Sequence, residues 1–489
     1  MLPWAVLCIL ACEACERFCY YSVRAVLVLL LQDLGYSKAT SVSLNSFWIS
    51  LCYISPLFGA ILSDSRWGRF HTILRFSLLY VAGMVLLALG GALRVAPLVF
   101  VGLSLVALGT GGIKPSVGPF GADQLAPPGG ELSAAASTSY FFAFYFCINI
   151  GSLGAYFFTP LVRASFGFGG ALTAPAVAMV ASLLIFLLPW RGYARVAPQG
   201  SALLAVWATA RAACQRRRRG AEPPGGGSGG APTTGTWLDA AAGAPGVGAG
   251  DVVNAAALWR MLPLLSMLPF FWAVFDAHSS VWLLQAEAMD LCFGGSGAAC
   301  IQPDQVPVLN PILVVCLIPA IERLLKAPFL AALRPTPLRR MAGGLFLSAA
   351  AFAASGALQG AIEGGARPQV AFQAPQYALL TVSEVFVSAT GLEFFYSEAP
   401  PPVKSVVLAL FFLTTAAGDL MNGLLYAALG FLATSSLIWV VTALNVLAAL
   451  LFCWLAARFV PRGGSGGAPA VEGSPEDERA LLIPPARKA

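Results

Sequence analysis

Apolar segments of about 20 residues recur along the whole chain, and they constrain the fold more than any other feature of the sequence. An apolar helix of about 20 residues crosses a bilayer, because each residue adds about 1.5 Å and the hydrocarbon core is about 30 Å thick. The segments lie near 3–31, 43–63, 71–93, 97–118, 139–162 and 170–190, and after a long break near 261–289, 306–328, 339–362, 371–396, 404–430 and 434–460. We therefore expect an all-α membrane protein with twelve transmembrane helices in two six-helix bundles.

The composition supports a membrane protein and argues against other classes. Hydrophobic residues make up 58% of the chain and charged residues 11%, whereas soluble proteins carry about 25% charged residues. The net charge of +6 comes mainly from loops between segments, which does not indicate nucleic-acid binding. Cys12 and Cys15 form a CxxC pair, but no second pair or neighbouring histidine completes a metal site. Since no activated nucleophile or phosphate-binding loop is visible either, we expect no enzyme, metal or cofactor.

Four regions follow from this pattern: a bundle over 1–190, a flexible basic cytosolic linker over 191–258, a second bundle over 259–460 and a disordered cytosolic tail over 461–489. Basic residues gather in the loops that share a side with both chain ends, so the positive-inside rule places both termini in the cytosol. Two six-helix halves joined by a basic linker are the layout of the major facilitator superfamily, in which the substrate binds between the halves.

Two short features concern the loops and the tail. Cys292 and Cys300 share one expected outer loop, where a disulfide and two free thiols are equally good interpretations. In the tail, Asp477 precedes Leu481 and Leu482 at the spacing of an acidic dileucine signal. Such a signal is read by a sorting adaptor and directs membrane proteins to endosomes and lysosomes. The alternative is an idle disordered tail.

Ionisable residues inside the apolar segments indicate a functional or structural role, because a charge at the bilayer centre costs about 2.5–3.5 kcal/mol. The first segment carries six polar residues on one helical face: Glu13, Glu16, Arg17, Tyr20, Tyr21 and Arg24. We expect this face to line a wet cavity, with Glu13 and Arg17 paired at i, i+4. The alternative is an ion-pair cluster that only fixes helix packing.

Two more charges lie deep in other segments. Lys114, in GTGGIKPSVGPFGADQL, has Glu13 and Glu16 as its expected counter-charges, so a proton moving onto a glutamate would free the lysine for another anion. Glu384 has no basic residue in its own segment before Lys404. Its partner would be a cationic ligand, unless it is held protonated as a hydrogen-bond donor between helices.

Residues in different segments match in depth once the topology is drawn. Arg24 and Asp276 both fall in the outer half of the membrane, and Arg260 and Glu322 both fall at the inner mouth. We expect an outer and an inner gate pair, although Arg260 and Glu322 could also form one constant interfacial pair. Aromatic and amide groups suited to a small polar ligand, or to packing alone, are Tyr53, Tyr145, Asn149, Trp272 and Asn310.

Several of these stretches resemble motifs of the proton-coupled oligopeptide transporter family. ACEACERFCYYSVRAVL resembles its ExxERFxYY element, and GAILSDSRWGRFHTI, GTGGIKPSVGPFGADQL and FFAFYFCINIG resemble three further motifs. In the second half, FFWAVFDAHSSVWLLQA, IQPDQVPVLN and GLEFFYSEAP resemble peptide-carrying members. The resemblance covers nearly every segment and implies the fold of the major facilitator superfamily and proton-driven symport of di- and tripeptides by alternating access.

The resemblance also implies roles for individual residues. Proton coupling would involve Glu13, Glu16, Arg17, Lys114 and Glu384. The substrate would be bound by Arg17, Tyr21, Arg24, Tyr53, Lys114, Tyr145, Asn149, Trp272, Asn310 and Glu384. Arg17, Tyr21 and Lys114 would hold the peptide carboxylate, and Glu384, Asn149 and Asn310 its amine. The protein would act as a monomer in the bilayer.

Departures from the family pattern refine this expectation. Ser46 stands where animal intestinal-type members keep a histidine, and Phe411 stands where many members have a tryptophan. The stretch from Gly364 to Phe372 is short where those animal members insert a large outer domain. Without that outer domain and with the dileucine-like tail, the chain resembles most the animal peptide/histidine branch, which implies an endolysosomal membrane and transport of free histidine, with the plasma membrane as the alternative. Rival functions are a nitrate or amino-acid carrier and a non-transporting sensor or adaptor scaffold.

Overall fold

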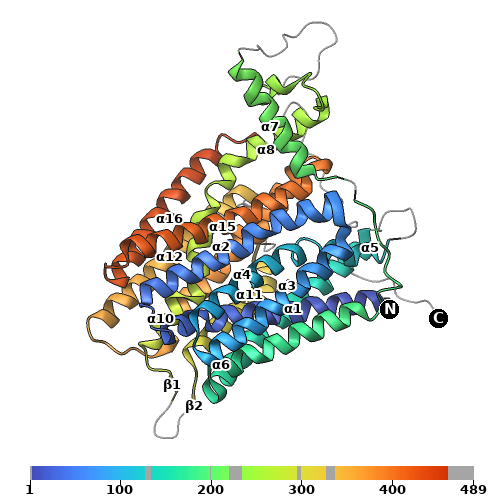
Figure 1. Ribbon diagram of the computed structural model, residues 1–489. Coiled ribbons are helices and arrows are strands. Elements are labelled where there is room, and N and C mark those ends of the chain that lie inside the picture. Colours follow the sequence, from blue (N-terminus) through green and yellow to red (C-terminus); the bar gives the residue numbers. More distant parts are fainter. Residues whose placement is uncertain are drawn as a thin grey trace, which may run out of the picture.

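The computed structural model describes residues 3–126, 134–198, 200–219, 234–293, 299–325 and 336–460. Long helices lie side by side in one bundle, and a smaller helical unit around α7 projects from one end (Figure 1). The first half contains α1 (Trp4–Asp33), α2 (Lys38–Leu62), α3 (Gly68–Leu93), α4 (Ala96–Ile113), α5 (Val117–Asp123) and α6 (Ala134–Leu187). The second half contains α8 (Ala249–Leu265), α9 (Leu268–Phe275), α10 (Val281–Glu287), α11 (Leu309–Leu325), α12 (Pro337–Glu363), α13 (Ala374–Glu384), α14 (Thr390–Glu398), α15 (Lys404–Leu429) and α16 (Thr434–Ala456).

Two glycines with positive φ divide helical stretches that are too long for one crossing. A π-helical turn, η1 (Ser63–Trp67), follows α2, and Gly68 then begins α3 with a φ of 71°. Within the 54 residues of α6, Gly167 leaves the helical conformation with a φ of 67°. A helix of that length would extend about 80 Å, far more than a bilayer requires, so the break at Gly167 yields two crossings.

The helices are long and apolar enough for a membrane protein. Seven helical stretches of the described residues could cross a bilayer, and the bent pair of Ala249–Leu265 with Leu268–Glu287 makes eight. Two of the seven, Lys38–Leu93 and Ser139–Leu187, contain the glycine breaks and account for two crossings each. With α1, which carries buried charges, and the shorter α11, these described segments agree with the expected twelve crossings.

The described part of the linker is more ordered than we expect from its composition. Helix α7 (Ala202–Arg218) and the short 3-10 helix η2 (Trp237–Ala241) lie inside the range 191–258. They pack on the start of α8 through a small apolar core that includes Ala213, Leu238 and Val252. The prediction of a flexible linker is therefore wrong for these two segments, because side chains such as Leu238 find an apolar partner in α8. Residue 199 and residues 220–233 of this range, and the tail, 461–489, lie outside the described residues.

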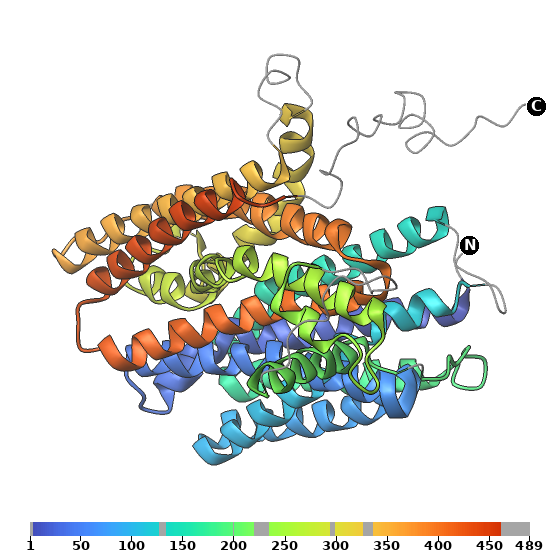
Figure 2. The ribbon, with the colours of Figure 1, turned by 90° about the horizontal axis from the view of Figure 1, so that it is seen from above.

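The bundle has two distinguishable ends. At one end, called the hairpin end, the strands β1 (Cys292–Phe293) and β2 (Ala299–Cys300) pair antiparallel, and a disulfide joins Cys292 to Cys300. This decides between the two interpretations of these cysteines in favour of a disulfide. The other end, called the linker end, carries the start of α1 and the base of α7, and Figure 2 shows the N-terminus on this side of the bundle.

Candidate functional site

The two halves are packed together at the hairpin end. A shared apolar core combines Val28, Leu29 and Val42 of the first half with Val274, Trp282 and Tyr426 of the second. Helices α2 and α15 also meet there along a seam of neutral hydrogen bonds, the α2–α15 seam. The hydroxyl of Ser43 donates to the carbonyl of Gly423 at 2.8 Å, and that of Ser50 donates to Ala416 at 2.9 Å. Ser46 lies in the same seam, where its hydroxyl accepts from Asn422 at 3.3 Å.

Ion pairs between the halves add to the closure of the hairpin end. The guanidinium of Arg24 pairs with Asp276, and its Nε donates to Ser279 Oγ at 2.8 Å. Arg163 makes two bonds to the buried Asp304, of 2.6 Å from Nε and 2.8 Å from the terminal nitrogen. A fully buried pair such as Arg24 and Asp276 leaves an uncompensated charge if one partner is removed. The pairing expected for Arg24 and Asp276 is therefore present, and it joins α1 to the segment that follows α9.

At the linker end the halves separate around a cavity. The cavity has a volume of about 410 Å³ and takes its walls from both halves. The first half contributes Pro56, Lys114 and Phe144, and the second half contributes Tyr396 and Phe412. Pockets of about 300–1,000 Å³ are typical of small-molecule sites. The protein is thus closed at the hairpin end and open between its halves at the linker end.

Lys114 lies at this cavity and is not paired with a glutamate. It follows the last residue of α4, where Pro115 ends the regular hydrogen bonding of the helix. Its ammonium lies 3.2 Å from the ring centroid of Tyr53 and 5.3 Å from that of Phe412, and no described residue accepts a hydrogen bond from it. The expectation that Glu13 and Glu16 are its direct counter-charges is wrong in this conformation, because Arg17 takes both of them. Lys114 instead presents a cation held by aromatic rings.

Arg17 is the centre of a buried charged cluster on α1. Its Nε lies 3.2 Å from Glu13 Oε1 and 2.5 Å from Glu16 Oε2, and all three side chains are buried. The close packing of α6 against this cluster depends on Gly151, whose added Cβ would meet the Arg17 Cβ at 2.8 Å. Two carboxylates therefore share one guanidinium in a place where water is scarce.

Glu384 forms the acidic counterpart in the second half. It is the last residue of α13, and a π-helical turn, η7 (Val385–Ala389), follows it directly. Such π turns widen the backbone and occur frequently at functional sites. The amide of Asn310 donates to Glu384 Oε2 at 2.9 Å and lies 3.3 Å from Thr381 Oγ1. The carboxylate is thus oriented by one neutral neighbour, and no cation pairs with it among the described residues.

Aromatic residues connect the basic and acidic groups. Tyr21 is close enough to feel the charges of Arg17 and Arg24 and also that of Glu384. Tyr145, half exposed, also feels the charge of Glu384 from the opposite half. The side-chain amide of Asn149 donates to the carbonyl of Tyr145 at 2.8 Å, which leaves the amide oxygen of Asn149 available.

Trp272 on α9 is packed beside α15 in the second half. Its indole donates to Thr414 Oγ1 at 3.1 Å, and its ring meets Phe411 edge-on at 6.0 Å. Phe411 therefore fills the position beside Trp272 with a ring that has no hydrogen-bonding group.

The remaining expected residues are not brought into one site. Arg260 donates to the carbonyl of Thr234 at 2.8 Å. The side chain of Glu322 lies outside the described part of the chain, so its pairing with Arg260 stays a prediction. Asp477, Leu481 and Leu482 also lie outside the described residues.

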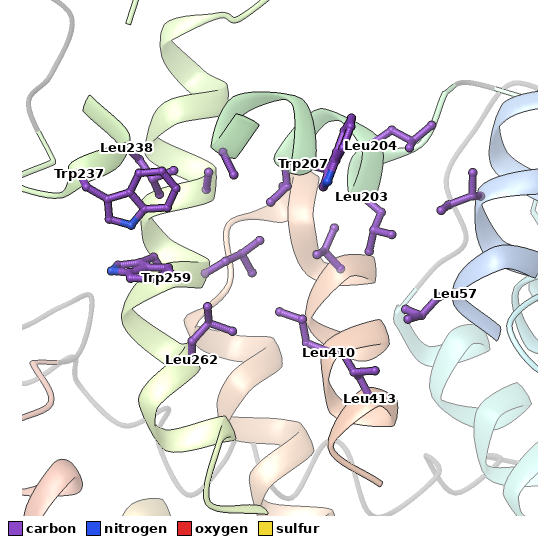
Figure 3. Close-up of a pocket in the computed structure, with 16 residues that line it drawn as sticks. Leu57, Leu203, Leu204, Trp207, Trp237, Leu238, Trp259, Leu262, Leu410 and Leu413 are labelled. Carbon is purple, nitrogen blue, oxygen red and sulfur yellow. The ribbon is translucent and has the colours of Figure 1, made fainter. Parts of the chain in front are cut away.

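A second cavity at the linker end is apolar and separate from the charged groups. It has a volume of about 570 Å³ and lies between α2, α7, α8 and α15. Figure 3 shows Leu57 on one side and Leu410 and Leu413 on another, below Trp207. Its side chains are aliphatic or tryptophan, so it offers no charged group to the ends of a polar ligand.

Some residues of the interface between the halves were missed from the sequence. Asp419 on α15 is fully buried beside the Arg24–Asp276 pair, and Arg163 bonds to Asp304. The signal for Asp419 was present, because it is a charged residue inside the apolar segment 404–430. Arg163 and Asp304 lie at segment ends, where charged residues are common and do not by themselves indicate a buried ion pair.

These features define the class of protein. Two helical halves, closed at one end and open at the other around buried charges, are the arrangement of a membrane carrier with the fold of the major facilitator superfamily. Solved structures agree: a crystal structure of an auto-inhibited POT family peptide transporter matches with a TM-score of 0.79 at 30% identity, covering 95% of this chain and 99% of that one. A proton dependent oligopeptide (POT) family transporter matches with a TM-score of 0.74 at 28% identity, covering 92% and 100%.

Sequence comparison identifies the family. The model of the POT family matches residues 70–431, and the chain therefore belongs to the POT family of transporters. Solute carrier family 15 member 2 of Rattus norvegicus is 38% identical over 411 residues, which are 80% of this chain and 53% of the relative. Peptide transporter family 1 of Drosophila melanogaster is 35% identical over 369 residues, 73% and 48% of the two chains. The chain thus spans about half the length of the curated relatives it matches.

Proposed function

We propose that the protein is a symporter that uses the proton gradient and the membrane potential to move di- and tripeptides across the membrane by alternating access. The observation that carries this proposal is the separation of a basic pole, Arg17 and Lys114, from an acidic pole, Glu384 with Asn310, with Tyr21 close to both poles. A short peptide carries a carboxylate and an amine at its two ends, so its charges match those of the two poles.

The charged cluster on α1 supports proton coupling. Glu13 and Glu16 share Arg17, so protonation of either glutamate would loosen that glutamate's hold on the guanidinium. Arg17 would then be available to a substrate carboxylate, next to Lys114. The names of related proteins favour this substrate class, since both the Drosophila relative and the 30% identical solved structure are named as peptide transporters.

The orientation and location are part of the same proposal. We infer that the linker end, with the basic linker and both termini, faces the cytosol. The Cys292–Cys300 disulfide at the opposite end supports this orientation, because disulfides persist in oxidising compartments. The tail with Leu481 and Leu482 favours an endolysosomal membrane and a sorting adaptor as partner, with the plasma membrane as the alternative. The protein would function as a monomer.

Uptake into proteoliposomes tests the function. A labelled dipeptide is offered with and without an inward proton gradient, and tripeptide, free histidine and nitrate serve as competitors. We expect gradient-driven uptake that tripeptide blocks, and competition by histidine would extend the substrates to free histidine. Uptake of nitrate or of amino acids without peptide would establish the rival carrier function. No uptake of any solute by well-folded protein would favour a sensor or adaptor.

A further inference from the structure

A second carboxyl group lies beside the ion pair that joins the halves at the hairpin end. Asp419 on α15 has an exposed fraction of 0%, and Arg24 and Asp276 each have 2%. Helix α15 packs closely on α9 here, because a Cβ added at Gly418 would lie 2.8 Å from the Trp272 Cβ, and Asp419 feels the charge of Asp276. Three ionisable groups from α1, from the segment after α9 and from α15 therefore meet where both halves are in contact.

The hydrogen bonds of this cluster are incomplete as long as both acids are ionised. Arg24 pairs with Oδ1 of Asp276. Oδ2 of Asp276 and both carboxyl oxygens of Asp419 accept no hydrogen bond from any described residue. Two buried carboxylates side by side repel each other, and one guanidinium compensates only one of them. A single proton between the two acids would remove the repulsion and provide the missing donor.

We propose that Asp419 is a proton-binding site, whose carboxyl group donates a hydrogen bond to Oδ2 of Asp276 while the hairpin end is closed. The proton leaves when the halves separate at that end and water reaches the carboxyl group. This deepens the proposed function and rests on it in one respect, because it assigns control over closure of the hairpin end during transport to a proton outside the Glu13, Glu16 and Arg17 cluster.

The surroundings of Asp419 agree with this assignment. The other charged and titratable groups whose charges act on this cluster include Tyr20, Tyr21, Cys52, Tyr53, Lys114, Tyr156, His278 and Glu384. Arg24 is committed to Asp276 and Ser279, and Lys114 is held over the ring of Tyr53. Neither cation bonds to Asp419, so a proton is its remaining source of compensation among the described residues.

The protonation state of Asp419 sets the direction of the pH effect. Below the titration range, the protonated Asp419 leaves the cluster neutral and favours closure of the hairpin end. Raising the pH removes the proton and leaves one excess negative charge, which favours hydration and separation of the halves there. A proton taken up from the hairpin side would therefore close that side behind a bound substrate.

Infrared spectroscopy of the full chain in lipid tests the site without relying on transport. A protonated carboxyl group has a carbonyl stretch that a carboxylate lacks. We expect the difference spectrum, wild type minus Asp419→Asn, to show one such band at neutral pH. The control is Asp33→Asn, which removes an acid paired with the exposed Arg94 and should leave the band in place. Asparagine keeps the shape and can donate to Asp276, so the fold is preserved. Identical carboxyl bands in wild type and Asp419→Asn would overturn the proposal.

A second variant tests whether Asp276 is the partner. In Asp276→Asn, the single remaining acid, Asp419, becomes the counter-ion of Arg24 and should ionise, so its band should disappear. A band that persists in Asp276→Asn would show that burial alone protonates Asp419, and the shared proton would be ruled out.

Transport measurements separate this inference from the proposed function. We expect Asp419→Asn to retain dipeptide exchange while its gradient-driven uptake depends less steeply on pH than that of wild type. An unchanged pH profile in this variant, with proton-driven dipeptide uptake intact, would reject Asp419 and leave peptide symport standing. Absence of any peptide flux in wild type, with the Asp419 band present, would reject peptide symport and leave the proton site standing.

Discussion

The guanidinium of Arg17 is bonded to both Glu13 and Glu16, two acids of its own helix. This relationship is local, because Glu13 lies one helical turn before Arg17, where side chains at i and i+4 meet, and Glu16 directly precedes Arg17 in the chain. It explains why Lys114 is left without an acidic partner and lies on the ring of Tyr53 instead. The two acids of α1 and the cation of Lys114 are therefore bound to different partners, Arg17 and the ring of Tyr53.

Replacing one of these acids should separate accumulation from exchange. Glu16→Gln cannot take up or release a proton, so we expect loss of uphill dipeptide accumulation with surviving exchange of peptide across the membrane. Counterflow and gradient-driven uptake measured on the same proteoliposomes check this. The control is Glu287→Gln, which removes an exposed acid paired with the exposed Lys38. Accumulation equal to wild type in Glu16→Gln would exclude a coupling role.

Glu384→Gln should abolish or strongly weaken dipeptide uptake without lowering expression. A hydrogen bond to a charged group contributes about 1.5–3 kcal/mol, which corresponds to a loss of binding of about 10- to 100-fold. A dipeptide analogue without its amino group should bind equally to Glu384→Gln and to wild type in competition assays. Normal dipeptide uptake by the variant would remove the assignment of Glu384 to the substrate amine.

The aromatic ring of Tyr53, rather than its hydroxyl group, should hold the ammonium group of Lys114 in position. A cation–π contact in a desolvated site contributes about 2 kcal/mol. We therefore expect Tyr53→Phe to transport like wild type and Tyr53→Leu to raise the KM for dipeptide by about tenfold or more. Equal KM values for the two variants would show that Lys114 does not depend on this ring.

Exchanging the charges of Arg163 and Asp304 should restore the dipeptide uptake that either single charge reversal reduces. Each single reversal sets two like charges against each other between α6 and the segment before α11. We expect Arg163→Asp and Asp304→Arg each to reduce initial dipeptide uptake several-fold, and the double variant to recover a large part of it. In a double-mutant cycle the coupling should reach about 1 kcal/mol or more. Additive losses would mean that the pair does not help to close the hairpin end.

The tail signal can be tested in cells. Changing Leu481 and Leu482 to Ala should move the protein from internal membranes to the cell surface, because an adaptor would no longer recognise the pair. Surface biotinylation measures the shift, and replacing the tail residue Lys488 by Ala serves as a control that leaves the dileucine intact. An unchanged distribution would discard the signal.

The architecture could be predicted because the membrane imposes it. Segments such as 43–63 and 404–430 must be helices of at least bilayer length, and α2 and α15 occupy them. Residues such as Glu384 and Arg24 were identifiable because a charge inside such a segment is costly. The disulfide between Cys292 and Cys300 remained open, since sequence spacing does not determine whether two thiols meet.

Contacts between segments could not be predicted in the same way. The sequence does not reveal that α15 passes the end of α9, and so the meeting of Asp419 with Asp276 was invisible. Lys114 was assigned to the glutamates on charge alone, although Arg17 reaches them within one turn of its own helix. The linker composition also concealed α7, whose apolar residues fold only because α8 and η2 provide a surface for them.

The α2–α15 seam has a consequence for how easily the protein can move. The hydroxyls of Ser43 and Ser50 donate to carbonyls of Gly423 and Ala416, which lie inside a continuous helix. A serine hydroxyl can rotate back to a carbonyl of its own helix, so these bonds can break without stranding a polar group. These two bonds therefore add little to the energy barrier to opening, and the charged contacts between the halves would contribute more.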